Sequence, residues 1–199
     1  MSFLTRWKEQ RAITRWEVEG KPAPPPHAVK RRNILRYRDE LGLKILVETG
    51  TYKGDMVEAM KGEFDKVYSI ELADHFYEAA VKRFENDANV EILHGDSGRV
   101  VKELLPRLDQ PSLFWLDGHY SAGNTARGDK DTPVMEELEH IFSVPDIRCA
   151  ILIDDARCFE GDSDQVYPST DQVRALVAKH RADWKVEVED DSIRITPPA

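Results

Sequence analysis

The chain has 199 residues, a formal net charge of −9 at pH 7 and an apolar content of 41%, which suit one α/β domain with a full core better than two domains. No stretch approaches the length of a membrane span, and basic residues interrupt any signal-like apolar run near the N-terminus, so we expect no membrane association. A sequence pI near 5.2 argues against duplex nucleic acid as the main partner. Two cysteines are too few for a disulfide framework, which favours a reduced, cytoplasmic compartment.

The charge is unevenly distributed along the chain. Residues 1–40 contain ten Lys/Arg against five Asp/Glu, a net charge of +5, which leaves −14 for residues 41–199. Such a basic segment could meet an anionic partner, or it could dock on its own acidic domain. We expect docking.

The basic segment itself has three parts. A helical arm over residues 1–20 is followed by a proline-rich linker over 21–26, which cannot be regular helix or central strand, and by a second helix over 28–41. We therefore divide the chain into an arm of residues 1–43 and a domain of residues 44–199. The two tryptophans of the arm could pack internally or anchor a homodimer.

Residues 45–60 have the pattern of a strand, a tight turn and a helix. An apolar run ends at Glu48, and two glycines, the first of them Gly50, follow it. In an open α/β sheet this first crossover lies where a nucleotide-like ligand binds. The dinucleotide pattern needs glycines where this chain has Tyr52 and Asp55, and Asp55 would repel a phosphate. A ligand with an adenosine end and no phosphates suits the turn better; the alternative is a glycine-rich turn without a ligand.

The turn sequence Glu48–Gly54, ETGTYKG, resembles the E-x-G-x-x-x-G motif of class I S-adenosylmethionine (SAM) methyltransferases. This resemblance covers roughly residues 44–199. It implies an α/β, Rossmann-like class I methyltransferase fold: a mostly parallel seven-stranded sheet, helices on both faces and a C-terminal antiparallel hairpin. The alternating apolar residues on either side of Asp190-Asp191 predict that hairpin independently. The turn residues expected to contact SAM are Glu48, Thr49, Gly50, Thr51 and Tyr52.

Two further strands end in residues suited to bind the cofactor. Glu71 ends a predicted strand over 66–72 and lies 21 residues after Gly50, close to the ~20 residues expected before an acid that binds ribose hydroxyls. The family resemblance implies that Asp96, after the next strand, contacts the adenine, with Ser97 beside it. Alternatively, Ser97 serves only as the N-cap of the following helix.

Acidic side chains end the next two predicted strands, over residues 112–120 and 150–155. Both are continuous apolar runs, as expected for central parallel strands; Asp117 ends the first and Asp154 and Asp155 end the second. Adjacent strands lie ~4.8 Å apart, so these carboxylates can converge on one hard cation such as Mg²⁺. The pattern resembles metal-dependent O-methyltransferases of the catechol and macrolide-sugar types. The alternative is that the aspartates only cap helices, form turns or are solvated.

A histidine and a polar loop follow Asp117. His119 is the best candidate for the base that deprotonates an acceptor hydroxyl, because its pKa lies near working pH, with Asp117 beside it in the catalytic site; a loop histidine bonded to backbone is the alternative. The glycine-containing segment 121–131 is expected to form a lid.

We therefore expect a SAM-dependent O-methyltransferase that acts on a small polyhydroxylated acceptor such as a sugar or glycoside, with possible assistance from Mg²⁺. A methyltransferase that needs no metal is the rival within the same class. The alternative from another class is a non-catalytic SAM-binding or scaffold protein with the same fold.

Overall fold

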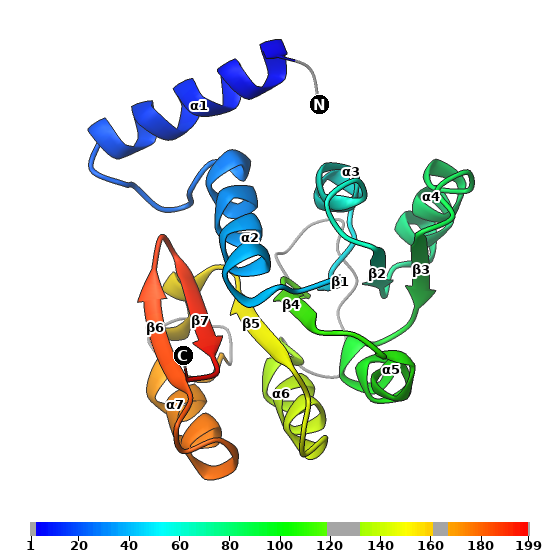
Figure 1. The fold of residues 1–199 in the computed structure, drawn as a ribbon, viewed down its shortest axis with the longest axis vertical. Coiled ribbons are helices and arrows are strands. Elements are labelled where there is room, and N and C mark those ends of the chain that lie inside the picture. Colours follow the sequence, from blue (N-terminus) through cyan, green and yellow to red (C-terminus); the bar gives the residue numbers. More distant parts are fainter. Residues whose placement is uncertain (1–2, 119–131, 161–166, 199) are drawn as a thin grey trace.

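A seven-stranded sheet forms the centre of the computed structural model, which describes residues 3–118, 132–160 and 167–198. The strands are β1 (Ile45–Thr49), β2 (Lys66–Glu71), β3 (Val90–His94), β4 (Ser112–Leu116), β5 (Cys149–Ile153), β6 (Lys185–Glu189) and β7 (Ser192–Thr196). Their spatial order is β3-β2-β1-β4-β5-β7-β6 (Figure 1). The first five strands are parallel, and β7 is antiparallel to both of its neighbours. The predicted class I methyltransferase fold is confirmed.

Helices cover both faces of this sheet. The helices of the described ranges are α1 (Phe3–Val18), α2 (His27–Leu41), α3 (Asp55–Met60), α4 (Asp74–Arg83), α5 (Ser97–Leu104), α6 (Val134–Ser143) and α7 (Thr170–His180), with short 3-10 turns at Leu105–Arg107 and Ala156–Glu160. Within these ranges, helix α1 packs on α2 and not on the sheet (Figure 1). Helices α2, α3 and α4 lie on one face, and α5, α6 and α7 lie on the other (Figure 1).

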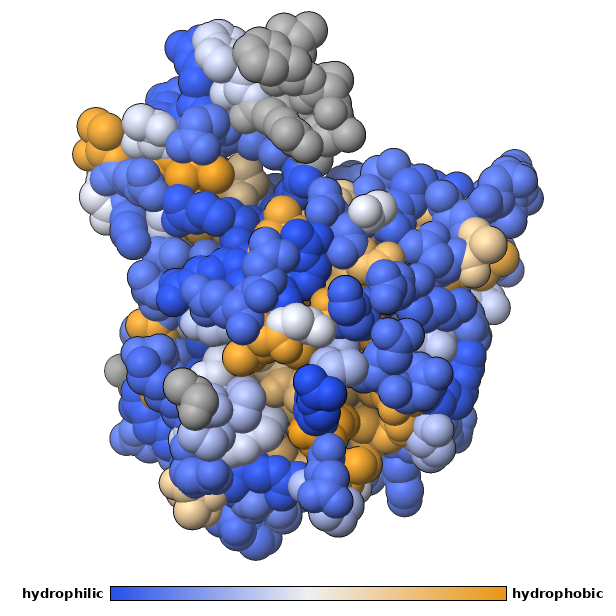
Figure 2. All heavy atoms as spheres, viewed as in Figure 1, coloured by the Kyte–Doolittle hydropathy of each residue, from blue (hydrophilic) through white to orange (hydrophobic). Residues whose placement is uncertain are grey.

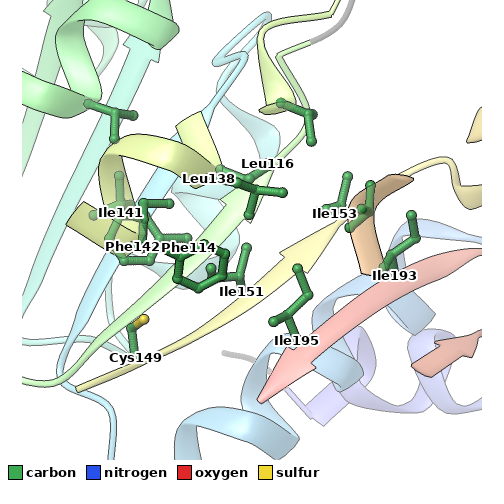
Figure 3. Close-up of a cluster of buried hydrophobic side chains, with 14 of the residues drawn as sticks. Phe114, Leu116, Leu138, Ile141, Phe142, Cys149, Ile151, Ile153, Ile193 and Ile195 are labelled. Atoms are coloured by element: carbon green, nitrogen blue, oxygen red, sulfur yellow. The ribbon is translucent and has the colours of Figure 1, made fainter. Parts of the chain in front are cut away.

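The central strands are buried on both faces, which explains their continuous apolar sequences. Every residue of β1, β4 and β5 is buried. Phe114 and Ile151 pack on the face of α6 (Figure 3), whereas Trp115 and Leu152 pack with Ile34 of α2 on the other face. The sheet is therefore held between two apolar layers, and its strand ends are fixed in position.

The basic N-terminal segment docks on the rest of the chain. Trp16 of α1 is buried against Val29 of α2. From α2, Arg31 and Arg38 reach Glu63 at 3.5 and 2.7 Å. The prediction of docking is confirmed, and α2 is also part of the main core. A domain boundary after residue 43 stays a prediction.

The turn between β6 and β7 is a contact point for several segments. Asp190 and Asp191 have positive φ angles of 52° and 58°, as in the tight turns of two-residue hairpins. The carboxylate of Asp190 accepts hydrogen bonds from Lys21 at 2.9 Å and from Arg194 at 3.0 Å. The carboxylate of Asp191 pairs with Arg157. The turn thus connects the linker, the last strand and the segment after β5.

The outer surface is mainly hydrophilic on the face shown in Figure 2, in line with a content of 33% charged residues. None of the helices in the described ranges has the length and apolarity needed to cross a membrane.

Helix α7 begins with a reciprocal cap. The hydroxyl of Ser169 accepts a hydrogen bond from the Gln172 amide at 3.2 Å, and the Gln172 side chain accepts one from the Ser169 amide at 2.7 Å. Two of the donors that a helix N-terminus leaves without partners are therefore satisfied.

Substituting Ser169→Ala should lower the free energy of unfolding by about 1 kcal/mol, because it removes this cap. Urea denaturation followed by circular dichroism would measure the loss. Lys179→Gln, on the exposed side of the same helix, is the control and should stay within about 0.5 kcal/mol of the wild type. Equal stabilities of Ser169→Ala and the control would contradict the role of the cap.

Candidate cofactor and active site

The turn after β1 is built so that its backbone touches the end of β4. Gly50 has a φ of +86°, and a Cβ atom there would lie 2.5 Å from the carbonyl oxygen of Asp117. Only glycine fits this contact without displacing the backbone. The turn that carries the proposed cofactor motif therefore lies directly against Asp117.

Glu71 holds the same turn from the side of β2. One carboxylate oxygen accepts a hydrogen bond from the Tyr52 amide at 2.7 Å, and the other accepts one from the Ala73 amide at 2.8 Å. Tyr52 has a φ of +49°, and this amide contact helps to hold it there. Each carboxylate oxygen has a second lone pair, so Glu71 can still accept a hydrogen bond from a ribose hydroxyl.

Glu48 lies beneath the turn and is fully buried. Its carboxyl accepts a hydrogen bond from the Ser69 hydroxyl, which lies 2.6 Å from the Thr51 hydroxyl. Burial raises the pKa of Glu48 to about 8; the Ser69 hydrogen bond opposes this shift, and the charges of Asp117 and Glu71 add to it. Glu48 is therefore mostly protonated at pH 7 and supports Thr51 from below. Its contact with SAM stays a prediction.

Asp96 and Ser97 lie at the start of α5. The expectation that Ser97 is the N-cap is wrong: Asp96 occupies that position, and its side chain makes no capping hydrogen bond. Capping by the side chain therefore does not account for an aspartate at position 96. A Cβ atom on Gly118 would lie 3.3 Å from the Ser97 hydroxyl and 3.0 Å from the Thr49 hydroxyl. Thr49 and Ser97, both predicted to bind SAM, thus lie beside Gly118 at the exit of β4.

The three aspartates at the ends of β4 and β5 come together in space. Asp117, Asp154 and Asp155 each offer a carboxylate oxygen, and these atoms lie within 4.8 Å of one another. Asp154 is 1% exposed, and its Oδ1 has no hydrogen-bond partner within the described ranges. Carboxylate oxygens in this number suit Mg²⁺, Mn²⁺ or Ca²⁺. The role of the three as metal ligands stays a prediction.

Lys30 of α2, which was not predicted to belong to the site, reaches into this acidic cluster. Its amine donates to Asp154 and lies 3.8 Å from Asp155. Burial acts to lower the pKa of the Lys30 amine, but the charges of Asp154 and Asp117 outweigh it and raise that pKa. A signal does exist in the sequence, because Lys30 lies one helical turn before the buried Ile34. This position predicts that the amine faces the sheet, but it does not indicate which acids the amine meets.

Arg157 supplies a second cation to the acidic cluster, and it was not predicted to belong to the site either. Its guanidinium donates to Asp155 at 2.9 Å and pairs with Asp191 in the turn between β6 and β7. The opposite charge of Arg157 compensates Asp155, and the link ties the acidic cluster to the last turn of the sheet.

Two predictions fall on residues that the structure does not describe. His119, the expected base, and the segment 121–131, the expected lid, both lie in residues 119–131, outside the described ranges.

The fold and the strand-end residues together define the class that the chain resembles. Neither the protein-family models nor the curated proteins gave a sequence match. Among solved structures, the O-methyltransferase TomG from Streptomyces achromogenes in complex with SAM is similar at a TM-score of 0.57, with 15% identity over 96% of this chain and 89% of that one. The O-methyltransferase from Bacillus cereus in complex with SAH gives a TM-score of 0.59, with 13% identity over 94% and 90%. The chain has the fold of these SAM-dependent methyltransferases.

Without ligand, Glu48→Gln should be more stable than the wild type, and this difference in stability should increase as the pH rises. The folded chain keeps the Glu48 proton up to a pKa of about 8, whereas the unfolded chain releases it near the ordinary value of 4.5. The cost of burying this acid therefore grows between pH 4.5 and 8, by about 1.4 kcal/mol for each pH unit. A Gln carbonyl can still accept from Ser69 and has no proton to lose.

Urea unfolding of wild type and Glu48→Gln at pH 5 and pH 8 would measure this effect. We expect a small difference at pH 5 and a gain of several kcal/mol for the variant at pH 8. A difference that does not change with pH would show that Glu48 is ionised in the folded protein.

Proposed function

We propose that this chain is a SAM-dependent methyltransferase that transfers a methyl group to an oxygen of a small polyhydroxylated acceptor, such as a sugar or glycoside. One observation carries the proposal: Asp117 belongs to both halves of the site. Its backbone touches Gly50 of the cofactor turn, and its carboxylate lies within 4.8 Å of Asp154 and Asp155. An acceptor held by the aspartates would therefore lie next to the cofactor.

In the cofactor half of the proposed site, each group of residues has its own role. Glu71 accepts hydrogen bonds from the ribose hydroxyls, Asp96 contacts the adenine, and the turn residues 48–52 with Ser97 line the rest of the SAM site. The similarity of fold to TomG and to the Bacillus cereus enzyme, whose structures hold SAM and SAH, supports SAM as the cofactor.

The acceptor half offers carboxylates as its main chemical groups. Asp117, Asp154 and Asp155 would hold a divalent ion, and the buried Oδ1 of Asp154, without a partner in the described chain, fits a ligand of such an ion. When bound, SAM would supply a sulfonium methyl group, with S-adenosylhomocysteine as the leaving group, and a divalent ion would lower the pKa of an acceptor hydroxyl. The aspartates orient that hydroxyl towards the cofactor, and His119 takes its proton.

A non-catalytic SAM-binding or scaffold protein is the second candidate. The arm, with Trp7 51% exposed, would then be its contact surface. The number of acids gathered at the strand ends argues for an enzyme, because a scaffold does not need them. A small-molecule acceptor, a homodimer and the lack of a nucleic-acid partner remain predictions.

Calorimetric titration of SAM, with and without Mg²⁺ and with NAD⁺ for comparison, is the first test. We expect a dissociation constant on the order of micromolar for SAM and no heat from NAD⁺. Glu71→Gln should weaken SAM binding at least about tenfold, because it removes charge from both the ribose contact and the Tyr52 amide. Glu78→Gln, exposed on α4, is the control. Without SAM binding in the wild type, the scaffold interpretation would take first place.

Asp154→Ala should lower Mg²⁺-dependent methyl transfer by at least about a hundredfold while SAM affinity stays unchanged, because the aspartate holds the acceptor half only. Transfer of the labelled methyl group of SAM to a panel of sugars and phenols would be measured. Asp146→Ala, exposed before the amino end of β5, is the control. Full turnover in Asp154→Ala would remove the metal site from the mechanism.

A further inference from the structure

Lys30 occupies a position in α2 that the fold fixes. It lies one helical turn before Ile34 and two before Tyr37, both buried against the sheet, and Val29 beside it is fully buried. Helix α2 is further held by the pairs of Arg31 and Arg38 with Glu63. The Cα of Lys30 therefore cannot move far, and only its side chain can change position.

The helix itself gives no reason to place a cation there. Lys30 lies in the first turn of α2, where the helix dipole is positive and a positive side chain is disfavoured. Below it, the sheet presents Asp154, which pairs directly with its amine, and Asp155 at 3.8 Å. The carboxylates are thus what stabilises the amine in this position.

The amine contacts two of the three carboxylates that a divalent ion would need: it pairs with Oδ2 of Asp154 and lies 3.8 Å from Oδ1 of Asp155. A bound Mg²⁺ needs oxygens at about 2.0–2.1 Å, and one carboxylate oxygen from each of the three aspartates lies within 4.8 Å of the others. An ammonium group and a divalent cation held by the same carboxylates repel each other. The amine therefore lowers the affinity of the cluster for the ion.

We propose that Lys30 is the resident cation of the Asp117–Asp154–Asp155 cluster and that it competes with a divalent ion for these carboxylates. This inference rests on the proposed metal site. Lys30 then lowers the metal affinity of the protein. An ion must either overcome the repulsion of the nearby amine or displace it from Asp154, which separates a buried ion pair. The flexible stem of a lysine allows the amine to withdraw towards solvent while α2 stays in place.

A purely structural ion pair is the competing explanation. In that case Lys30 only fastens α2 to the sheet, and its removal would lower stability without changing metal affinity. The two explanations differ in one measurable quantity, the affinity for a divalent ion in the absence of any acceptor.

The test is titration of Mn²⁺ alone into the full chain, with free Mn²⁺ followed by electron paramagnetic resonance. Lys30→Met should bind one Mn²⁺ at least about tenfold more tightly than the wild type, a change of about 1.4 kcal/mol, while Lys30→Arg should keep the weak affinity. Lys44→Met, exposed at the amino end of β1, removes the same charge elsewhere and should leave the affinity unchanged. Adding Asp154→Asn to Lys30→Met should abolish the gain.

Equal Mn²⁺ affinities of the wild type and Lys30→Met, or no binding by either, would overturn the inference. So would a gain in Lys30→Arg equal to that in Lys30→Met, because the charge would then be irrelevant. SAM calorimetry on each variant shows that it is folded. It also separates the two proposals: unchanged Mn²⁺ affinity with intact SAM binding defeats only the role of Lys30, whereas a wild type that does not bind SAM defeats the methyltransferase.

Discussion

Negative charge gathered at the carboxyl edge of one sheet is the constraint on which the rest of this structure depends. Removing a carboxylate from water costs several kcal/mol unless a proton or a partner compensates it. The fold uses both solutions. Glu48, beneath the cofactor turn, keeps its proton because its pKa is about 8, whereas Asp154 and Asp155 stay beside Lys30 and Arg157. In the proposed function, the neutral acid lies on the side of the cofactor and the paired acids lie on the side of the acceptor.

Through Lys30, the N-terminal segment contributes to the charge balance of the acidic cluster. Helix α2 contributes Ile34 and Tyr37 to the main core and places Lys30 above β5. Arm, linker and domain are therefore coupled through charge as well as through apolar contact. A disturbance of the way α2 packs would change the electrostatic environment of Asp154 without altering any residue of the sheet.

Much of the fold could be predicted from the sequence because its signals are local. Continuous apolar runs that end in acids indicate buried parallel strands, and Asp190-Asp191 between alternating residues indicates the hairpin. The gathering of Asp117, Asp154 and Asp155 follows from strand order alone. Lys30 could not be found in this way, since its partners lie more than a hundred positions along the chain and its helix was assigned to the arm. The raised pKa of Glu48 depends on complete burial, and Asp96 rather than Ser97 is the cap because of a backbone angle. None of these three features can be read from the amino-acid composition.

The turn between β6 and β7 has a consequence for how this chain can vary. Hairpin turns at a surface usually tolerate insertions. Here, however, Asp190 binds Lys21 and the buried Arg194. Asp191 binds Arg157, which also contacts Asp155 of the acidic cluster. Lengthening this turn would release a buried guanidinium and a cation of the acidic cluster together. A short loop at the rim of the sheet, remote from the cofactor motif in sequence, is therefore a poor place to insert a tag or to join a second domain.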